Sequence, residues 1–249
     1  MTKTAPVTAF AALAVIAAGL IISCAKSEMR ILVFSKTAGY RHQSIVAGKQ
    51  ALFKLARERG FEVDTTENSD DFNEQTLQKY DALMFLCTSG EVLNEAQQEA
   101  MRRFIQNGGG FIGIHSAADT EYEWEWYGRL VGAYFNAHPN DPNVREGAMA
   151  IVDPQHEATQ KLPSTWKRMD EWYDYKSVQT DLKVLITVDE ASYKRSEENP
   201  QTAPHAIAWY HEFDGGRAFY TGLGHTSESY AEALFLEHVY GGLKYATGK

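Results

Sequence analysis

The sequence is poor in cysteine, in positive charge and in linker-like segments, and each shortage excludes a class of protein. Its 249 residues include two cysteines, too few for a fold held by disulfides. Lys and Arg number 24 against 33 Asp and Glu, so the net charge is −9. A nucleic-acid-binding domain needs a basic surface, so we expect no nucleic-acid partner. No internal repeat and no segment rich in Pro, Gly or Ser divides the chain, which favours a single folded domain.

One long apolar run lies near the N-terminus, at residues 9–22 (AFAALAVIAAGLII). It is shorter than the roughly 20 residues of a membrane-spanning helix and has the length typical of a secretory signal peptide. The run ends at Ile21-Ile22-Ser23-Cys24, which resembles a bacterial lipobox, where the cysteine is lipidated and becomes the mature N-terminus. The alternative is an ordinary signal peptide that is cleaved nearby.

This N-terminal pattern predicts three segments: a lipoprotein signal peptide (1–23), the lipidated Cys24 with a short tether (24–28), and a folded domain (29–249). A lipid on Cys24 would anchor the protein to a membrane without a spanning helix. Ala25 rather than Asp follows the cysteine, which by the sorting pattern of such lipoproteins indicates the outer membrane. We therefore expect a lipoprotein of the bacterial cell envelope that faces the periplasm. Nothing in the sequence indicates its oligomeric state.

The folded domain alternates strands with helices. Short apolar runs predict strands at 30–34, 61–65, 82–87 and 111–114, and helical spacing predicts helices at 43–59 and 94–107. Strands separated by helices imply right-handed crossovers and a parallel sheet covered on both faces. In the more mixed second half we expect strands at 147–152, 183–188, 205–210 and 217–221, a hairpin turn at 214–216 and a final helix at 229–245. The fold class is therefore α/β, with a single domain.

Ligands of open parallel sheets bind at the carboxyl ends of the strands. Three of the four loops expected at this edge carry a histidine, namely His42, His115 and His225, and the fourth is residues 87–90. The stretch Gly113-Ile114-His115-Ser116-Ala117 has the pattern of a nucleophile elbow, a sharp strand-to-helix turn that exposes one side chain. Its tip is His115, which suits a base, an acid or a metal ligand. Ser116 lies one residue off the tip, so we do not expect it to be a nucleophile.

Four strings in the chain together resemble the ThuA-like family, which is named for trehalose utilisation. They are LVFSKTAGYRH near residue 32, GGGFIGIHSAAD ending at Asp119, DEWY at 170–173 and GGRAFYTGLGH ending at His225, and they span essentially the whole folded domain. The resemblance implies a flavodoxin-like fold of the class I glutamine amidotransferase type. It also implies that His115 replaces the amidotransferase cysteine, so the protein is not a glutamine amidotransferase. The family is linked to carbohydrate metabolism through neighbours such as oxidoreductases that act on the 3-position of glycosides.

We expect the catalytic residues to be His115, Glu171 and Asp119. The alternatives are that Asp119 only caps a helix, that His115 only donates to a backbone carbonyl, and that Glu171 is a solvated charge on an edge strand. Histidines with a carboxylate suit a divalent transition metal, Zn, Mn or Fe, and the candidate ligands are His42, His115 and His225. There is no HxH or HExxH motif, so the ligands would have to converge from separate loops.

The expected substrate is a small carbohydrate, because aromatic faces and polar groups gather near the predicted mouth. The residues expected to bind it are Tyr40, Arg41, His138, Tyr173 and Trp209. The segment 121–130 (EYEWEWYGRL) either lines this mouth or forms an amphipathic helix that packs Trp124 and Tyr127 on the sheet. His156 is either part of a helix start or structural. The remaining histidines, His205, His211 and His238, are expected to be structural or at the surface.

These observations favour an enzyme acting on a glycoside or a keto-sugar, as a lyase, hydrolase or isomerase. A keto group acidifies the neighbouring C–H, and His115 or Glu171 would remove that proton, with a metal or an arginine stabilising the enolate. The alternative is a non-catalytic carbohydrate-binding or accessory lipoprotein with a degenerate amidotransferase-like fold. Several titratable residues around the elbow favour the enzyme, because a binding protein needs mainly aromatic and amide groups.

Overall fold

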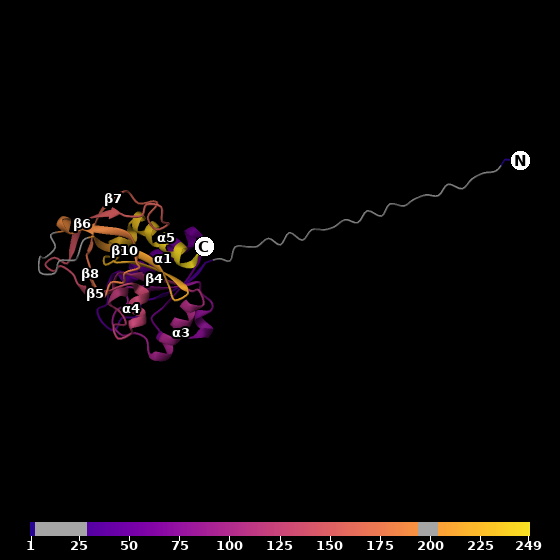
Figure 1. The fold of residues 1–249 in the computed structure, drawn as a ribbon, viewed down its shortest axis with the longest axis horizontal. Helices are drawn as coiled ribbons and strands as arrows, with labels where there is room; N and C mark the ends of the chain where they lie inside the picture. The colour runs from indigo at the N-terminus through magenta and orange to yellow at the C-terminus, as the bar shows by residue number, and fades with distance from the viewer. Residues whose placement is uncertain (3–28, 194–203) are drawn as a thin grey trace.

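The computed structural model describes residues 1–2, 29–193 and 204–249 (Figure 1). The apolar run, Cys24 and the tether lie outside the described residues, so their predicted roles stay predictions. Within the described residues, no helix has the length and apolar character needed to cross a membrane.

Five parallel strands form one half of the central nine-stranded sheet, in the order β2-β1-β3-β4-β11. They are β1 (Arg30–Phe34), β2 (Glu62–Thr66), β3 (Ala82–Leu86), β4 (Gly110–Ile114) and β11 (Gly216–Thr221). The four N-terminal strands begin and end within one residue of their predicted limits. Nearly all side chains of β1, β3 and β4 are buried, because helices cover both faces of this half.

The other half of the sheet is antiparallel and continues from β11 in the order β10-β9-β6-β7. Its strands are β10 (His205–Phe213), β9 (Lys183–Asp189), β6 (Val144–Ile151) and β7 (Thr165–Glu171). The hairpin predicted at residues 214–216 joins β10 to β11. The sequence did not predict β7 or the small sheet of β5 (Tyr134–Ala137) and β8 (Asp174–Lys176). In β7 buried and exposed residues alternate, so no continuous apolar run marks it.

Helices cover the parallel half on two sides, and Figure 1 shows α1 and α5 on one side of β4 and α3 and α4 on the other. Their bounds are α1 (Ser44–Arg59), α2 (Glu74–Leu77), α3 (Glu95–Gln106), α4 (Glu125–Val131) and α5 (Ala233–Thr247). Short 3₁₀ helices are η1 (Ser69–Asp71), η2 (His115–Asp119), η3 (Glu190–Tyr193) and η4 (Glu228–Ala231). The chain therefore has the single-domain α/β fold expected, with a mostly parallel central sheet flanked by helices.

For the aromatic segment 121–130, the structure supports the amphipathic helix packed on the sheet rather than a lining of the cavity mouth. Trp124 immediately precedes α4 and is 7% exposed, and Tyr127 is fully buried and donates a hydrogen bond to Ala117 O at 2.7 Å. His205, His211 and His238 are buried and bond to main-chain carbonyls, as expected for structural histidines.

Candidate metal centre

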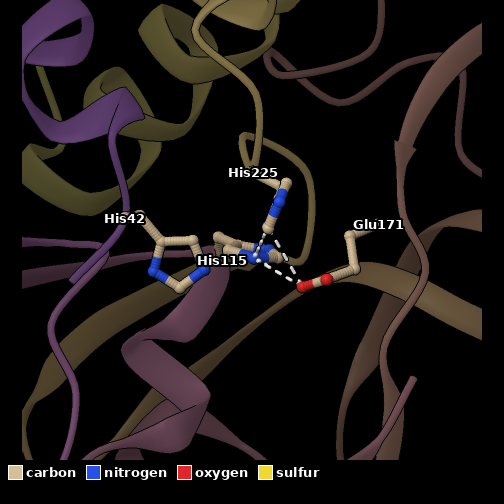
Figure 2. A group of neighbouring side chains, drawn as sticks. All are labelled: His42, His115, Glu171 and His225. Atoms are coloured by element: carbon tan, nitrogen blue, oxygen red, sulfur yellow. Dashed lines mark hydrogen bonds and ion pairs between the residues drawn. The ribbon is translucent and has the colours of Figure 1, made fainter. Parts of the chain in front are cut away.

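Four side chains from distant parts of the sequence converge at the carboxyl ends of β4 and β11. They are His42, His115, Glu171 and His225, and one ligand atom of each lies within 4.8 Å of the others (Figure 2). His42 follows β1, His115 follows β4, Glu171 ends β7 and His225 follows β11. The three histidines predicted from loop positions therefore meet, and Glu171 joins them from the antiparallel half of the sheet.

His115 occupies the tip of the predicted elbow. Its φ is 52°, in the left-handed region that side chains other than glycine seldom adopt, and it links β4 directly to η2. Gly113 makes room for this turn, because a Cβ there would lie 2.9 Å from Tyr220 and 3.2 Å from Ala117. The sharp turn is thus confirmed, and it brings the imidazole of His115 to the edge where the other three residues lie.

Three of the four residues form a compact triangle of ligand atoms, joined by the dashed lines in Figure 2. His115 Nε2 lies 3.1 Å from His225 Nδ1 and 3.3 Å from Glu171 Oε2. His225 Nδ1 lies 3.1 Å from the same carboxylate oxygen. Ligands about 2.0–2.1 Å from a transition metal, and about 90–110° apart, are separated by about 2.8–3.4 Å. The triangle therefore has the size of three ligands on one face of a metal ion.

Each of three ligand side chains is held by a partner on its far side. His115 Nδ1 bonds Gly222 O at 2.8 Å, so this nitrogen carries the proton and Nε2 offers a lone pair. His42 Nδ1 and Ser116 Oγ share a hydrogen bond of 3.2 Å. Glu171 Oε1 accepts from Asn143 Nδ2 at 2.6 Å. Such outer partners are typical of metal sites, where they fix the tautomer and orientation of the ligands.

Asp170, fully buried, ties two of the ligands together through their main chains. Its Oδ1 accepts from the backbone N–H of Glu171 at 3.0 Å and of His225 at 3.1 Å. Its Oδ2 accepts from Gly224 N at 2.9 Å and lies 3.2 Å from Arg168 Nη2. Gly224 has a φ of 105°, which favours glycine, so the loop can turn toward this carboxylate. Asp170 thus sets the position of Glu171 relative to His225.

The protonation states of the cluster suit a cation. Burial, followed by the charges of His115 and His225, lowers the pKa of His42 to about 2, so its imidazole is neutral at pH 7. Burial alone would raise the pKa of Glu171, but the contacts of its carboxylate with the imidazoles of His115 and His225, and attraction to the positive charge they carry when protonated, hold it well below its ordinary value. Burial would lower the pKa of His225, and its hydrogen bond and attraction to Glu171 outweigh this and raise it. A metal ion would supply the positive charge that this buried carboxylate favours.

A cavity of about 450 Å³ opens onto the cluster. It is lined by Tyr40, His42, Asp119, Phe135, His138, Asn140, Asp141, Pro142, Asn143, Glu171, Tyr173 and His225. Asp119 lies in this lining but outside the group of four, and its Oδ1 accepts from Tyr122 OH at 2.7 Å. Burial raises the pKa of Asp119 above its ordinary value, against the lowering effect of that hydrogen bond.

The residues predicted to bind substrate divide into two groups. Tyr40, His138 and Tyr173 line the cavity, and His138 Nε2 lies 3.5 Å from Glu171 Oε1. Arg41 does not, because its guanidinium pairs with Glu67 at 2.9 and 3.0 Å. Trp209 does not either, since it is 1% exposed in the core. Trp209 therefore packs in the apolar core, and Arg41 forms a salt bridge with Glu67 at the surface.

The sequence did not predict that Asn143 and Phe135 line the cavity, or that Asp170 accepts hydrogen bonds from the main chains of Glu171 and His225. Asp170 was in the DEWY string, which was one available signal, but its acceptor role depends on a loop 54 residues away. Asn143 lies in a loop without any motif, so no pattern marked it.

Comparisons with known proteins agree with this architecture. The family model described as "ThuA: Trehalose utilisation" matches residues 30–246. A ThuA-like protein of Bacteroides uniformis ATCC 8492 superimposes with a TM-score of 0.73 at 18% identity, covering 92% of this chain and 95% of that one. A ThuA-like protein of Parabacteroides merdae ATCC 43184 gives 0.67 at 18% identity, covering 89% and 91%.

A more distant structure, described as a GMP synthase protein of Thermoplasma acidophilum, gives a TM-score of 0.56 at 12% identity, covering 89% and 95%. At these identities the structural likeness shows the fold alone. No curated protein sequence matches the chain. The family model covers nearly all of the folded domain, and the chain therefore belongs to the ThuA family, which suggests a role in trehalose utilisation or, more broadly, carbohydrate metabolism.

Proposed function

We propose that this protein is a metal-dependent enzyme that acts on a glycoside or a keto-sugar. The observation that carries the proposal is the triangle of His115, His225 and Glu171, with His42 beside it. Three of these four residues, His42, Glu171 and His225, line a cavity at the edge of the sheet where ligands of such folds bind. Membership of a family described by trehalose utilisation supports a carbohydrate as substrate.

Three histidines and one carboxylate suit Zn, Mn or Fe(II). These four residues would hold the ion, which when bound would polarise a carbonyl oxygen of the substrate. Because the ligand atoms of His115 and Glu171 face His225 within 3.3 Å, both residues are better placed as ligands than as the proton-abstracting base expected from the sequence.

Proton transfer then falls to the cavity residues that stand outside the ligand group. Asp119 suits the base, since burial raises its pKa and Tyr122 fixes one of its oxygens. In a keto-glycoside, Asp119 would take the proton from the carbon beside the ketone, and its electron pair would form a C=C bond as the glycosidic C–O bond breaks. The leaving oxygen keeps the C–O electron pair and takes a proton from His138. The N-terminal pattern adds the proposal that Cys24 anchors this activity in the cell envelope.

The first test is metal content, measured on purified protein by elemental mass spectrometry. We expect about one transition-metal ion per chain in the wild type and its loss in His115→Ala and His225→Ala. His156→Gln is the matched control, because His156 lies outside the cluster and its Nδ1 accepts from Ala158 N.

Turnover of a 3-keto-glycoside by the metal-loaded protein is the second measurement. Elimination that is lost in Asp119→Asn supports the enzyme. Metal binding without turnover of any glycoside or keto-glycoside supports the accessory binding protein instead. No metal, even after reconstitution, refutes the metal-dependent mechanism.

A further inference from the structure

One wall of the cavity is a single loop, residues 138–143, which joins β5 to β6. Every residue of this loop except Pro139 lines the cavity. Two of its side chains reach the same oxygen of Glu171, since Asn143 Nδ2 lies 2.6 Å and His138 Nε2 lies 3.5 Å from Oε1. The position of the loop therefore decides how Glu171 is oriented toward the other candidate ligands.

The conformation of this loop depends on contacts from outside it. The loop contains no glycine, yet Asp141 has a φ of 52°, in the left-handed region. A residue other than glycine holds this conformation only where its surroundings enforce it. The groups that matter are therefore those that hold the main chain on each side of Asp141.

Arg145, on β6, holds the main chain on both sides of Asp141. Its Nε donates to Pro142 O at 2.8 Å, and its Nη2 donates to Asn140 O at 2.6 Å. Its Nη1 donates to Tyr193 O at 3.1 Å, in η3, so the guanidinium itself is fixed from a third direction. A planar guanidinium can bridge several acceptors at once, which the single ammonium of a lysine does less well.

The main chain of Arg145 is tied to the strand that carries Glu171. In the antiparallel pairing of β6 with β7, Val144, the residue before Arg145, lies directly opposite Glu171. The carbonyl of Arg145 also accepts from Nε1 of the fully buried Trp172 at 3.0 Å, and Trp172 follows Glu171 in the chain. Arg145 therefore connects the loop, through its side chain, to β7, through its main chain.

We propose that Arg145 is a positioning residue of the candidate metal centre, which holds the loop 138–143 against β7 so that Asn143 meets and orients Glu171. This inference rests on the proposed function, because it concerns the orientation of a proposed metal ligand. The competing role is electrostatic, and the two roles predict opposite results. On charge alone, loss of the Arg145 cation would tighten the binding of another cation nearby, whereas loss of a positioning residue weakens it.

The test is the Zn²⁺ affinity of the purified protein, measured by competition with a chromophoric chelator. We expect Arg145→Ala to weaken binding about tenfold, at the lower end of the range for partners that orient metal ligands. Arg145→Lys, which keeps the charge but loses the planar donors, should also weaken it. In protein that already carries Asn143→Ala, the change at Arg145 should alter the affinity by no more than about twofold, because Asn143 is the residue through which Arg145 acts.

Arg217→Ala is the matched control. Its guanidinium also donates to a main-chain carbonyl, that of Tyr245 at 3.4 Å, but Arg217 lies outside the cavity lining. The Zn²⁺ affinity of this variant should stay within about twofold of that of the wild type. Circular dichroism checks that each variant is folded, and where Arg145→Ala fails to fold, Arg145→Lys takes its place in the comparison.

An unchanged or tighter Zn²⁺ affinity in a folded Arg145 variant overturns the positioning role and leaves the metal-dependent enzyme standing. Weakening by Arg145→Ala that persists in full beside Asn143→Ala also overturns it, because Arg145 would then act by another route. If the wild type binds no Zn²⁺, the proposed function fails and this inference fails with it.

Discussion

Asn143 offers the sharpest test of the candidate metal centre, because it touches a ligand without being one. Its Nδ2 donates to Glu171 Oε1 at 2.6 Å, which leaves Oε2 directed at His115 and His225. A hydrogen bond to a charged group contributes about 1.5–3 kcal/mol, and about 1.4 kcal/mol corresponds to a factor of ten in affinity. We therefore expect Asn143→Ala to weaken metal binding by about 10–100-fold, the range typical of partners that orient metal ligands.

The measurement is competition for Zn²⁺ between the protein and a chromophoric chelator. Asn140→Ala is the matched control, because Asn140 lines the same loop but bonds Arg145 through its main-chain carbonyl. The Zn²⁺ affinity of the Asn140→Ala variant should stay within about twofold of that of the wild type. An unchanged affinity in Asn143→Ala, with the protein folded by circular dichroism, would refute the claim that Glu171 is oriented as a ligand.

Three further predictions concern buried charge and its removal. Asp170→Asn should lower the free energy of unfolding by about 1.5–3 kcal/mol in urea titrations, because it removes a buried charge that pairs with Arg168 and leaves Glu232 as the only carboxylate paired with that arginine among the described residues; a loss below about 0.5 kcal/mol would contradict this. Burial lowers the pKa of His238 to about 4, so this histidine stays neutral in the folded state at pH values where the unfolded chain, with a histidine pKa near 6.5, binds a proton. The contribution of His238 to the free energy of unfolding is therefore complete above pH 6.5 and falls by about 3 kcal/mol as the pH drops to 4. His238→Gln should flatten this part of the plot of unfolding free energy against pH. If the plots of the wild type and the variant run parallel, His238 is not the group responsible. Burial raises the pKa of the Cys87 thiol to about 12, so iodoacetamide at pH 8 should modify it in urea but not in the native protein, as peptide mass spectrometry will show.

Strands whose residues are buried on both sides give the clearest signal in the sequence. In β1, β3 and β4 almost every side chain is covered, so each is a continuous apolar run in the sequence. A strand with one face in solvent gives a weaker signal when its buried positions are themselves polar. The buried residues of β7 include Arg168, Asp170 and Glu171, so the strand looks like a charged loop.

The same distinction explains which site residues were foreseeable. Parallel strands end at one edge, so the topology alone places His42, His115 and His225 near one another. Glu171 comes from an antiparallel strand, to which that rule does not apply, and its candidacy rested on residue type and a family string. Asn143 lies in a loop that folds back toward the cluster. This position depends on tertiary packing, which no local sequence pattern encodes.

The elbow shows why a change of one residue can change the chemistry while the fold persists. A left-handed residue at the end of a central strand costs about 1–3 kcal/mol, and it persists only where the surroundings enforce it. Here the absence of a side chain at Gly113 leaves room for the turn, and the hydroxyl of Tyr220 donates to the main-chain carbonyl of His115 at 2.8 Å, a contact that does not involve the imidazole. A cysteine or serine there would be a nucleophile at the open edge of the sheet. His115 places an imidazole at the same point, within 3.3 Å of one atom each of His225 and Glu171. Under the proposed function, the turn that would present a nucleophile with cysteine or serine at its tip would here present a metal ligand.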